Sequence, residues 1–111
     1  MLKIINSTRL NSLPDAILFD TDNTLYPYEP AHAKAHCAVR TKMINILSIK
    51  PSVFDKAFSE AREQVKARLK STASSHSRLL YFQRMLEIMG LGSQFLLALD
   101  FEQTYWRVFL S

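Results

Sequence analysis

Two aspartates stand one residue apart, directly after an apolar run, in the sequence FDTDNT at residues 19–24. Aspartate is ionised at neutral pH, so Asp20 could attack phosphorus without a base to activate it. In extended backbone an acid two residues later lies on the same side. Asp22 could therefore protonate the leaving-group oxygen and then act as the base for water. The spacing favours phosphoryl transfer, with a separate role for each acid.

Such a site needs a counterion for its negative charge. A carboxylate and a phosphate repel by roughly 4 kcal/mol per pair of unit charges at about 4 Å and an effective dielectric of ~20. A hard divalent cation offsets this repulsion, and Mg²⁺ prefers carboxylate, carbonyl and phosphate oxygens. We therefore expect Mg²⁺ as the cofactor. Thr24 can hydrogen-bond and hold the turn, whereas Thr21 points away.

Other interpretations of the polar residues are open. Asp and Asn are frequent in turns because they hydrogen-bond nearby backbone, so DTDN also fits an ordinary turn. A calcium loop is excluded, since Leu25 and Ala31 stand where Gly and Glu are needed. His32 and His36, beside Cys37, have the spacing of a helical metal pair, but no third ligand is near. We expect these histidines on an exposed helix face.

The composition limits the class of protein. The chain has 111 residues, enough for one ordinary domain, and nearly half are apolar, as in globular proteins. Its two glycines exclude the usual Gly-rich phosphate loops. Cys37 is the only cysteine, so no internal disulfide can form and a reducing compartment is expected. The start lacks the apolar core of a signal peptide, and the apolar run 95–99 is too short to cross a membrane. We expect a soluble, cytoplasmic protein with no membrane partner.

The net charge of +4 raises the question of a nucleic-acid partner. The clustered basic residues are Lys66, Arg68, Lys70, Arg78 and Arg84. Acids are interleaved with them, and basic residues on helices more often form a solvated face than a phosphate-tracking stripe. We therefore expect no nucleic-acid partner. Lys34 and Arg40 could meet a phosphorylated substrate, but a solvated face is again the default.

One short strand and about four helices must position the aspartates. Residues 16–19 are typical of a buried strand. Pro30 suits the first position of a helix that runs up to Pro51. Ser52 and Asp55 then have the spacing of a capping box at the start of a second helix. A lone strand cannot form a sheet, so the chain looks unfinished.

The second half of the chain predicts two more helices. The polar connector 71–77 can cap a third helix, which Gly90 or Gly92 ends, and a fourth apolar segment begins at Ser93. The predicted core positions are Ala35, Val39, Met43, Ile46, Leu47, Phe54, Phe58, Ala61, Val65, Leu69, Leu79, Phe82, Leu86 and Met89. Five aromatics could line a base-stacking pocket, but their helical spacing favours the core: Tyr81, Phe82, Tyr105, Trp106 and Phe109. Residues 93–110 are too apolar for one buried stripe, which predicts self-association through them.

The sequence LFDTDNTLYPYEPAH resembles the first motif of the haloacid dehalogenase superfamily, Asp-x-Asp-x-Thr after an apolar strand. Its DNTLYP portion is similar to the pyrimidine-5′-nucleotidase-like and related small-phosphatase members. The resemblance is specific over residues 16–30 and looser through the helices, which stand where that family inserts a helical cap. It implies an α/β fold with a Rossmann-like core. Residues 1–26 would start that core with its first strand, residues 27–111 would form the mostly α cap, and the rest of the core would be missing.

The resemblance also implies roles for the motif residues. Asp20 would be the nucleophile and a Mg²⁺ ligand, and Asp22 the general acid and base, with its backbone carbonyl on the metal. Thr24 would support the loop. The activity implied is Mg²⁺-dependent hydrolysis of a phosphate monoester, a nucleotide or other small phosphorylated metabolite, through an aspartyl phosphate. Haloacid dehalogenases of the superfamily lack the second motif aspartate, so Asp22 favours a phosphatase.

The chain also departs from the family pattern. The family needs a later Ser or Thr, a later Lys and an acidic cluster, each after a further strand, yet the only aspartate beyond Asp55 is Asp100, in a helical pattern. We therefore expect these 111 residues alone to be inactive, and poorly folded or self-associating. The alternative is a non-catalytic remnant or helical interaction module with a vestigial motif.

Overall fold

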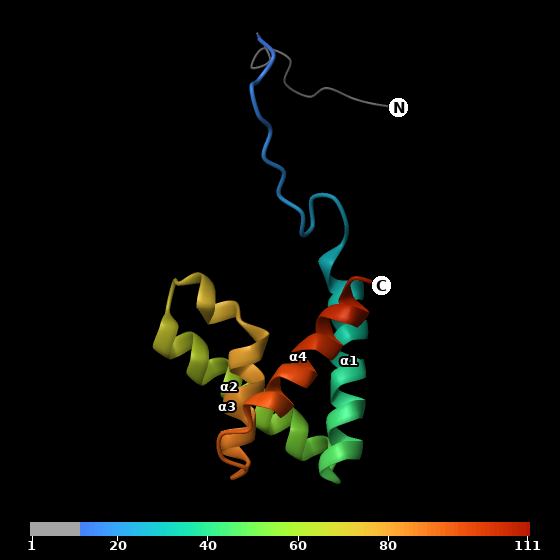
Figure 1. The fold of residues 1–111 in the computed structure, drawn as a ribbon, viewed down its shortest axis with the longest axis vertical. Helices are drawn as coiled ribbons and strands as arrows, with labels where there is room; N and C mark the ends of the chain where they lie inside the picture. The colour runs from blue at the N-terminus through green and yellow to red at the C-terminus, as the bar shows by residue number, and fades with distance from the viewer. Residues whose placement is uncertain (1–11) are drawn as a thin grey trace.

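Four α-helices follow the motif, as the sequence predicts. The computed structural model describes residues 12–111, and within that range it contains helices and no strand. The elements are α1 (Tyr28–Leu47), α2 (Pro51–Leu69), the 3₁₀ helix η2 (Ala73–His76), α3 (Arg78–Ile88) and α4 (Phe95–Phe109). Helix α4 packs against both α1 and α3, and α3 packs against α2 (Figure 1). The segment before α1 leads away from the helices (Figure 1).

The helix ends follow local rules, with two differences from prediction. The Ser77 hydroxyl accepts the backbone N–H of Leu80 at 3.4 Å and so caps α3, as expected. Helix α1 begins at Tyr28 rather than Pro30, because a proline is tolerated anywhere in a first turn, whose N–H groups lack helical partners. The capping box of Ser52 is absent. Pro51 already starts α2, so Ser52 stands inside the helix and no side chain caps it.

The core lies where the four helices meet. Its buried side chains are Ala35, Val39, Met43, Phe54, Ala57, Ala61, Val65, Tyr81, Phe82, Met85, Leu86, Ala98, Phe101, Tyr105 and Phe109. Most positions predicted from helical spacing are among them or are half-buried beside them. Ile46 was predicted as core but is 50% exposed; it lies on the same face as Val39 but in the last turn of α1, which ends at Leu47. Phe82 and Phe101 join α3 to α4 edge to face, with ring centroids 6.2 Å apart.

The predicted buried strand at residues 16–19 does not form within the described residues. Ile17, Leu18 and Phe19 are all exposed, Leu18 completely. A strand needs a neighbour to pair its backbone N–H and C=O groups, and no other strand lies within residues 12–111. The only ladder-type contact here is an isolated bridge between Asp22 and Tyr26. The expected Rossmann-like core therefore stays a prediction.

Helix α4 carries more apolar side chains than its partners cover. Phe101, Tyr105 and Phe109 are buried, whereas Leu96 and Leu110 remain exposed. This agrees with the expected excess of apolar surface, and the self-association inferred from it stays a prediction. Within residues 12–111, the helices are too short or too polar for any of them to span a lipid bilayer.

The turn after α3 gives a stability prediction. Gly90 has a φ of 77°, in the left-handed region, and a Cβ there would meet nothing within 4 Å. The cost of Gly90→Ala is therefore the backbone strain alone, about 1–2 kcal/mol of unfolding free energy. Urea denaturation monitored by circular dichroism measures this loss. The Gly90→Asn variant is the control and should lose less unfolding free energy, because Asn tolerates this conformation. Equal stability of the Ala variant and the wild type would contradict the argument.

Candidate functional site

The two aspartates lie in a tight turn that precedes α1. The carbonyl of Thr21 accepts the backbone N–H groups of Leu25 at 2.9 Å and Thr24 at 3.2 Å. Asn23 adopts the left-handed conformation, with φ of 57°, which Asn tolerates better than most residues. Its side-chain oxygen also accepts the N–H of Tyr28 at 3.0 Å. The turn is thereby tied to the first residue of α1.

Side-chain hydrogen bonds hold both carboxylates. The Thr24 hydroxyl donates to Oδ2 of Asp20 at 2.7 Å, so Thr24 makes the kind of contact expected of a supporting residue. The Tyr26 hydroxyl donates to Oδ1 of Asp22. This hydrogen bond is the main reason that the pKa of Tyr26 lies above its usual value. Sequence reasoning missed Tyr26, although a tyrosine four residues after an acid in a turn is a signal for such a contact. The catalytic roles of Asp20 and Asp22 stay predictions.

The donor set around the turn suits Mg²⁺. Proteins usually hold this ion with one or two carboxylates, while waters and substrate phosphates complete its shell. Asp20 offers a carboxylate, on which the Thr24 hydroxyl is the side-chain donor described above, and Asp22 offers a backbone carbonyl oxygen. Within residues 12–111, no group of three or more His, Cys, Asp or Glu side chains gathers as a metal site. The described residues therefore fit a Mg²⁺ site completed by water and phosphate, and do not fit a closed protein cage.

A cavity of about 560 Å³ opens beside the second aspartate. Its lining residues are Asp22, Asn23, Tyr28, Glu29, His32, Phe58, Arg62, Lys66, His76, Arg78 and Tyr81. They come from the turn, α1, α2, η2 and α3, so the motif and the helices share one concave site. A volume of this size lies in the range of small-molecule sites, about 300–1,000 Å³. The cavity is our candidate substrate site.

The histidines are not on an exposed helix face, which corrects the prediction. Nδ1 of His32 lies 2.7 Å from the Tyr105 hydroxyl, and the His36 ring lies 4.8 Å from the Phe58 ring, centroid to centroid. Both histidines are half-buried, because α1 turns this face toward α2 and α4. Cys37, the next residue, is exposed. Within the described residues the two histidines join no larger group of metal ligands.

The hydroxyl of Tyr105 holds His32 in place. Burial is the main cause that raises the pKa of Tyr105 to about 12, so its hydroxyl keeps its proton at neutral pH. The oxygen accepts a guanidinium N–H of Arg78 at 3.3 Å, which leaves the hydroxyl proton to be donated to Nδ1 of His32. Burial, followed by the charge of Arg78, lowers the pKa of His32, in keeping with a neutral imidazole.

Stability should fall in mild acid because of His36. Burial, followed by the charge of His32, lowers its pKa from the ordinary value of 6.5. As the pH falls through 6.5, the unfolded chain takes up the proton first, so the free energy of unfolding decreases until the folded histidine also titrates. We expect His36→Phe to show a smaller drop in melting temperature between pH 8 and pH 5 than the wild type. His76→Gln, at an exposed position, is the control. An unchanged drop in the His36 variant would contradict this cause.

The remaining candidates divide between core and surface. Of the five aromatics predicted as core, four are buried, and Trp106 is 39% exposed. Arg40 forms a bidentate ion pair with Asp55, at 2.7 and 2.8 Å, and Lys34 is exposed. The Arg40 guanidinium holds the pKa of the Asp55 carboxyl below its usual value.

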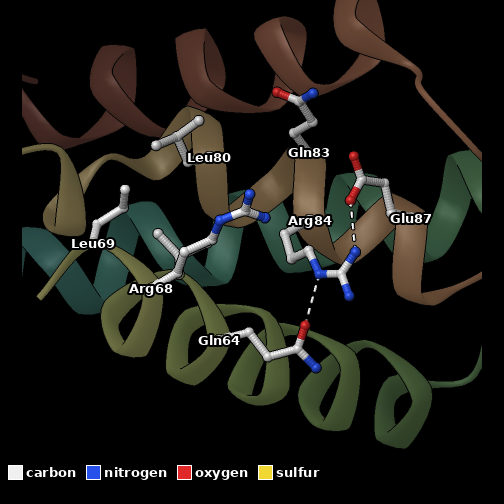
Figure 2. A pocket seen from close by; sticks show the side chains of 8 residues that line it. Gln64, Arg68, Leu69, Leu80, Gln83, Arg84 and Glu87 are labelled. Atoms are coloured by element: carbon white, nitrogen blue, oxygen red, sulfur yellow. Dashed lines mark hydrogen bonds and ion pairs between the residues drawn. The ribbon is translucent and has the colours of Figure 1, made fainter.

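A second cavity of about 380 Å³ lies between α2 and α3 (Figure 2). There Arg84 donates to the side-chain oxygen of Gln64 at 2.7 Å and pairs with Glu87 at 2.8 Å. Arg68 also lines this cavity, whereas Lys66 lines the cavity beside Asp22. Four of the five clustered basic residues are thus divided between two cavities, and Lys70 lines neither. No motif residue lines the second one, so we do not assign it to catalysis.

The comparisons with known proteins found a relative that matches over part of its own length. The chain is 34% identical over 96 residues to a ribulose-1,5-bisphosphate 5-phosphatase from Halopiger xanaduensis. The match covers 86% of the chain but 40% of the relative, so it spans less than half of that protein's length. No family model matches the chain, and no solved structure is significantly similar to it. The chain is therefore similar to part of a protein named as a phosphatase.

Proposed function

We propose that the protein hydrolyses phosphate monoesters in a Mg²⁺-dependent reaction through an aspartyl phosphate on Asp20. The observation that carries the proposal is the turn that holds Asp20 and Asp22, of which Asp22 lines a cavity that basic side chains also line. The resemblance of the same residues to the haloacid dehalogenase superfamily and the printed name of the relative support it. The substrate class is a small phosphorylated metabolite.

The first half-reaction uses both aspartates. Oδ2 of Asp20 accepts the Thr24 hydroxyl, so we assign Oδ1 to the attack on phosphorus. A bond forms from this oxygen to phosphorus while the ester bond breaks. Asp22 gives its proton to the departing alkoxide; because Tyr26 occupies Oδ1 of Asp22, we assign this proton to Oδ2.

The second half-reaction restores the starting state. The Asp22 carboxylate takes a proton from water while the water oxygen attacks phosphorus and the bond to Asp20 breaks. Inorganic phosphate leaves, Asp20 is ionised again and Asp22 is protonated again. Mg²⁺ held by the Asp20 carboxylate and the backbone carbonyl of Asp22 would offset the repulsion between carboxylate and phosphate. A halide leaving group needs no proton, so Asp22 favours this reaction over haloacid dehalogenation.

Phosphate release from p-nitrophenyl phosphate tests the proposal in the full-length protein. We expect turnover with Mg²⁺, loss of turnover on adding EDTA, and recovery when excess Mg²⁺ is restored. Chloroacetate should release no chloride under the same conditions. Turnover that EDTA does not affect, or chloride release without phosphatase activity, would contradict the proposal. Absence of both activities in folded protein would favour the non-catalytic interaction module.

A further inference from the structure

Three basic side chains face the candidate substrate cavity. Arg62 and Lys66 stand one helical turn apart on α2, and Arg78 stands at the start of α3. Phe58, Arg62 and Lys66 are spaced by four residues, so they lie along one face of α2. Asp22 from the motif turn lines the same cavity. The cavity therefore joins an acidic catalytic turn to a basic helical wall.

These three cations have no carboxylate partner within residues 12–111. The ion pairs in that range are Arg40 with Asp55, Lys42 with Asp100, and Arg84 with Glu87. Glu29 also lines the cavity but forms no ion pair with the basic wall. Three cations that share one cavity repel one another, and an anion between them would relieve that repulsion. The lowered pKa of His32, to which the charge of Arg78 contributes, is in keeping with positive potential here.

Arg78 is the anchored member of the group. Its guanidinium donates to the Tyr28 hydroxyl and to the backbone carbonyl of His76, and it lies 5.0 Å from the centroid of the Tyr105 ring. All of these partners are neutral, so its full positive charge remains. Such anchoring fixes the position of a cation before a ligand arrives, which lowers the entropic cost of binding. Arg62 is exposed and Lys66 is half-buried, and neither forms a salt bridge within residues 12–111, so their long side chains can adjust to the ligand.

The aromatic residues of the cavity do not offer a surface for a nucleobase. The Tyr81 ring is 3% exposed, and its hydroxyl donates to the carbonyl of Ser75 at 2.6 Å. The Phe58 ring stacks on Phe54, with centroids 5.7 Å apart, and the Tyr28 ring stacks on His32, with centroids 5.2 Å apart. Stacking a base needs an open ring face, and these rings are used in packing. The cavity therefore favours a second anion over a base.

We propose that Arg62, Lys66 and Arg78 bind a second phosphate group of the substrate, so that the preferred substrates are small bisphosphorylated metabolites. One phosphate would lie at Asp20 and Asp22, and the other would lie against the basic wall. The proposal rests on the proposed function in that it takes the ligand to be the substrate. It adds a residue-level account of specificity: charge-assisted hydrogen bonds to the distal phosphate select the ligand.

A matched pair of compounds tests this in the full-length protein: butane-1,4-diol bisphosphate and butyl phosphate, which differ only in the second phosphate. After correction for its two equivalent esters, the bisphosphate should have a kcat/KM at least about tenfold higher. The double variant Arg62→Gln, Lys66→Gln should lower that preference by about tenfold or more. Arg68→Gln, on the same helix but facing the second cavity, is the control and should keep the preference.

Calorimetry on the Asp20→Asn protein separates binding from turnover. It should bind the bisphosphate at least about tenfold more tightly than butyl phosphate, and adding Arg62→Gln and Lys66→Gln should remove the difference. Circular dichroism checks that each variant is folded. Equal binding of the two compounds, or a preference that survives the double substitution, would overturn the inference even if p-nitrophenyl phosphate is hydrolysed. A binding preference lost in the double variant, without any hydrolysis by the wild type, would support the anion site and reject the proposed function.

Discussion

The Asp20→Asn variant of the full-length protein is expected to lose at least about 10⁴-fold in kcat/KM for p-nitrophenyl phosphate. An amide has nearly the shape of the carboxylate but is no nucleophile, so no aspartyl phosphate can form. The amide oxygen can still accept the Thr24 hydroxyl, which keeps the turn in place. The loss should therefore report the chemistry rather than a collapsed loop. Phosphate release under saturating Mg²⁺ measures the rate.

The control for this prediction is Asp15→Asn, which makes the same chemical change at an exposed aspartate outside the motif. It should retain the wild-type rate. A second measurement is the amount of covalent phosphate on the protein when the reaction with labelled substrate is quenched in acid. The wild type should carry covalent phosphate and the Asp20 variant should carry none. Wild-type turnover by the Asp20 variant would disprove the assignment of the nucleophile.

The Asp22→Asn variant should lose about 10²- to 10⁴-fold, with the size of the loss set by the leaving group. A nitrophenolate departs without much help, whereas an alkoxide needs a proton as the ester bond breaks. The loss should therefore be larger for butyl phosphate than for p-nitrophenyl phosphate. The slope of log kcat/KM against the pKa of the leaving group measures this, and it should steepen in the variant.

Tyr26→Phe is the matched variant for the second aspartate, since it removes the hydroxyl that donates to Asp22 and leaves the carboxylate. We expect it to cost about tenfold or less, the scale of one hydrogen bond between neutral groups, with little change in the slope. An equal loss on both substrates in the Asp22 variant would show that Asp22 acts only through charge or metal binding. General acid catalysis by this residue would then be rejected.

The helices could be predicted because their determinants are local. Helical spacing identifies Val39 and Met43 as core, and the hydroxyl of Ser77 can only cap a helix that starts beside it. Gly90 ends α3 through its own backbone conformation. The predicted capping box at Ser52 failed for an equally local reason, since the preceding Pro51 already starts the helix. The start and end of these helices therefore depend mainly on residues at the helix ends themselves.

Part of the candidate site was also local. Asp20, Asp22 and Thr24 lie within five residues, so their chemistry and the supporting hydrogen bond follow from spacing in one turn. The roles inferred for them rest on that spacing and on the resemblance to a known motif. Residues 16–19 show the limit of such reasoning. Their composition predicts a buried strand, but burial needs a partner strand, and the described residues contain none.

The sequence alone determined the acidic turn, the order of the helices and the apolar stripe of each one, since these depend on neighbours within a few positions. Only the tertiary structure decided what the helices enclose. His36 was expected in solvent and lies against Phe58 because α1 packs beside α2, and Arg62 and Arg78 meet in one cavity because α2 and α3 pack together. The periodicity of one helix does not predict which other helix will cover a given part of its surface. The packing of all four helices together decides which face each helix buries. It also places Arg62 and Arg78 in the same cavity as Asp22.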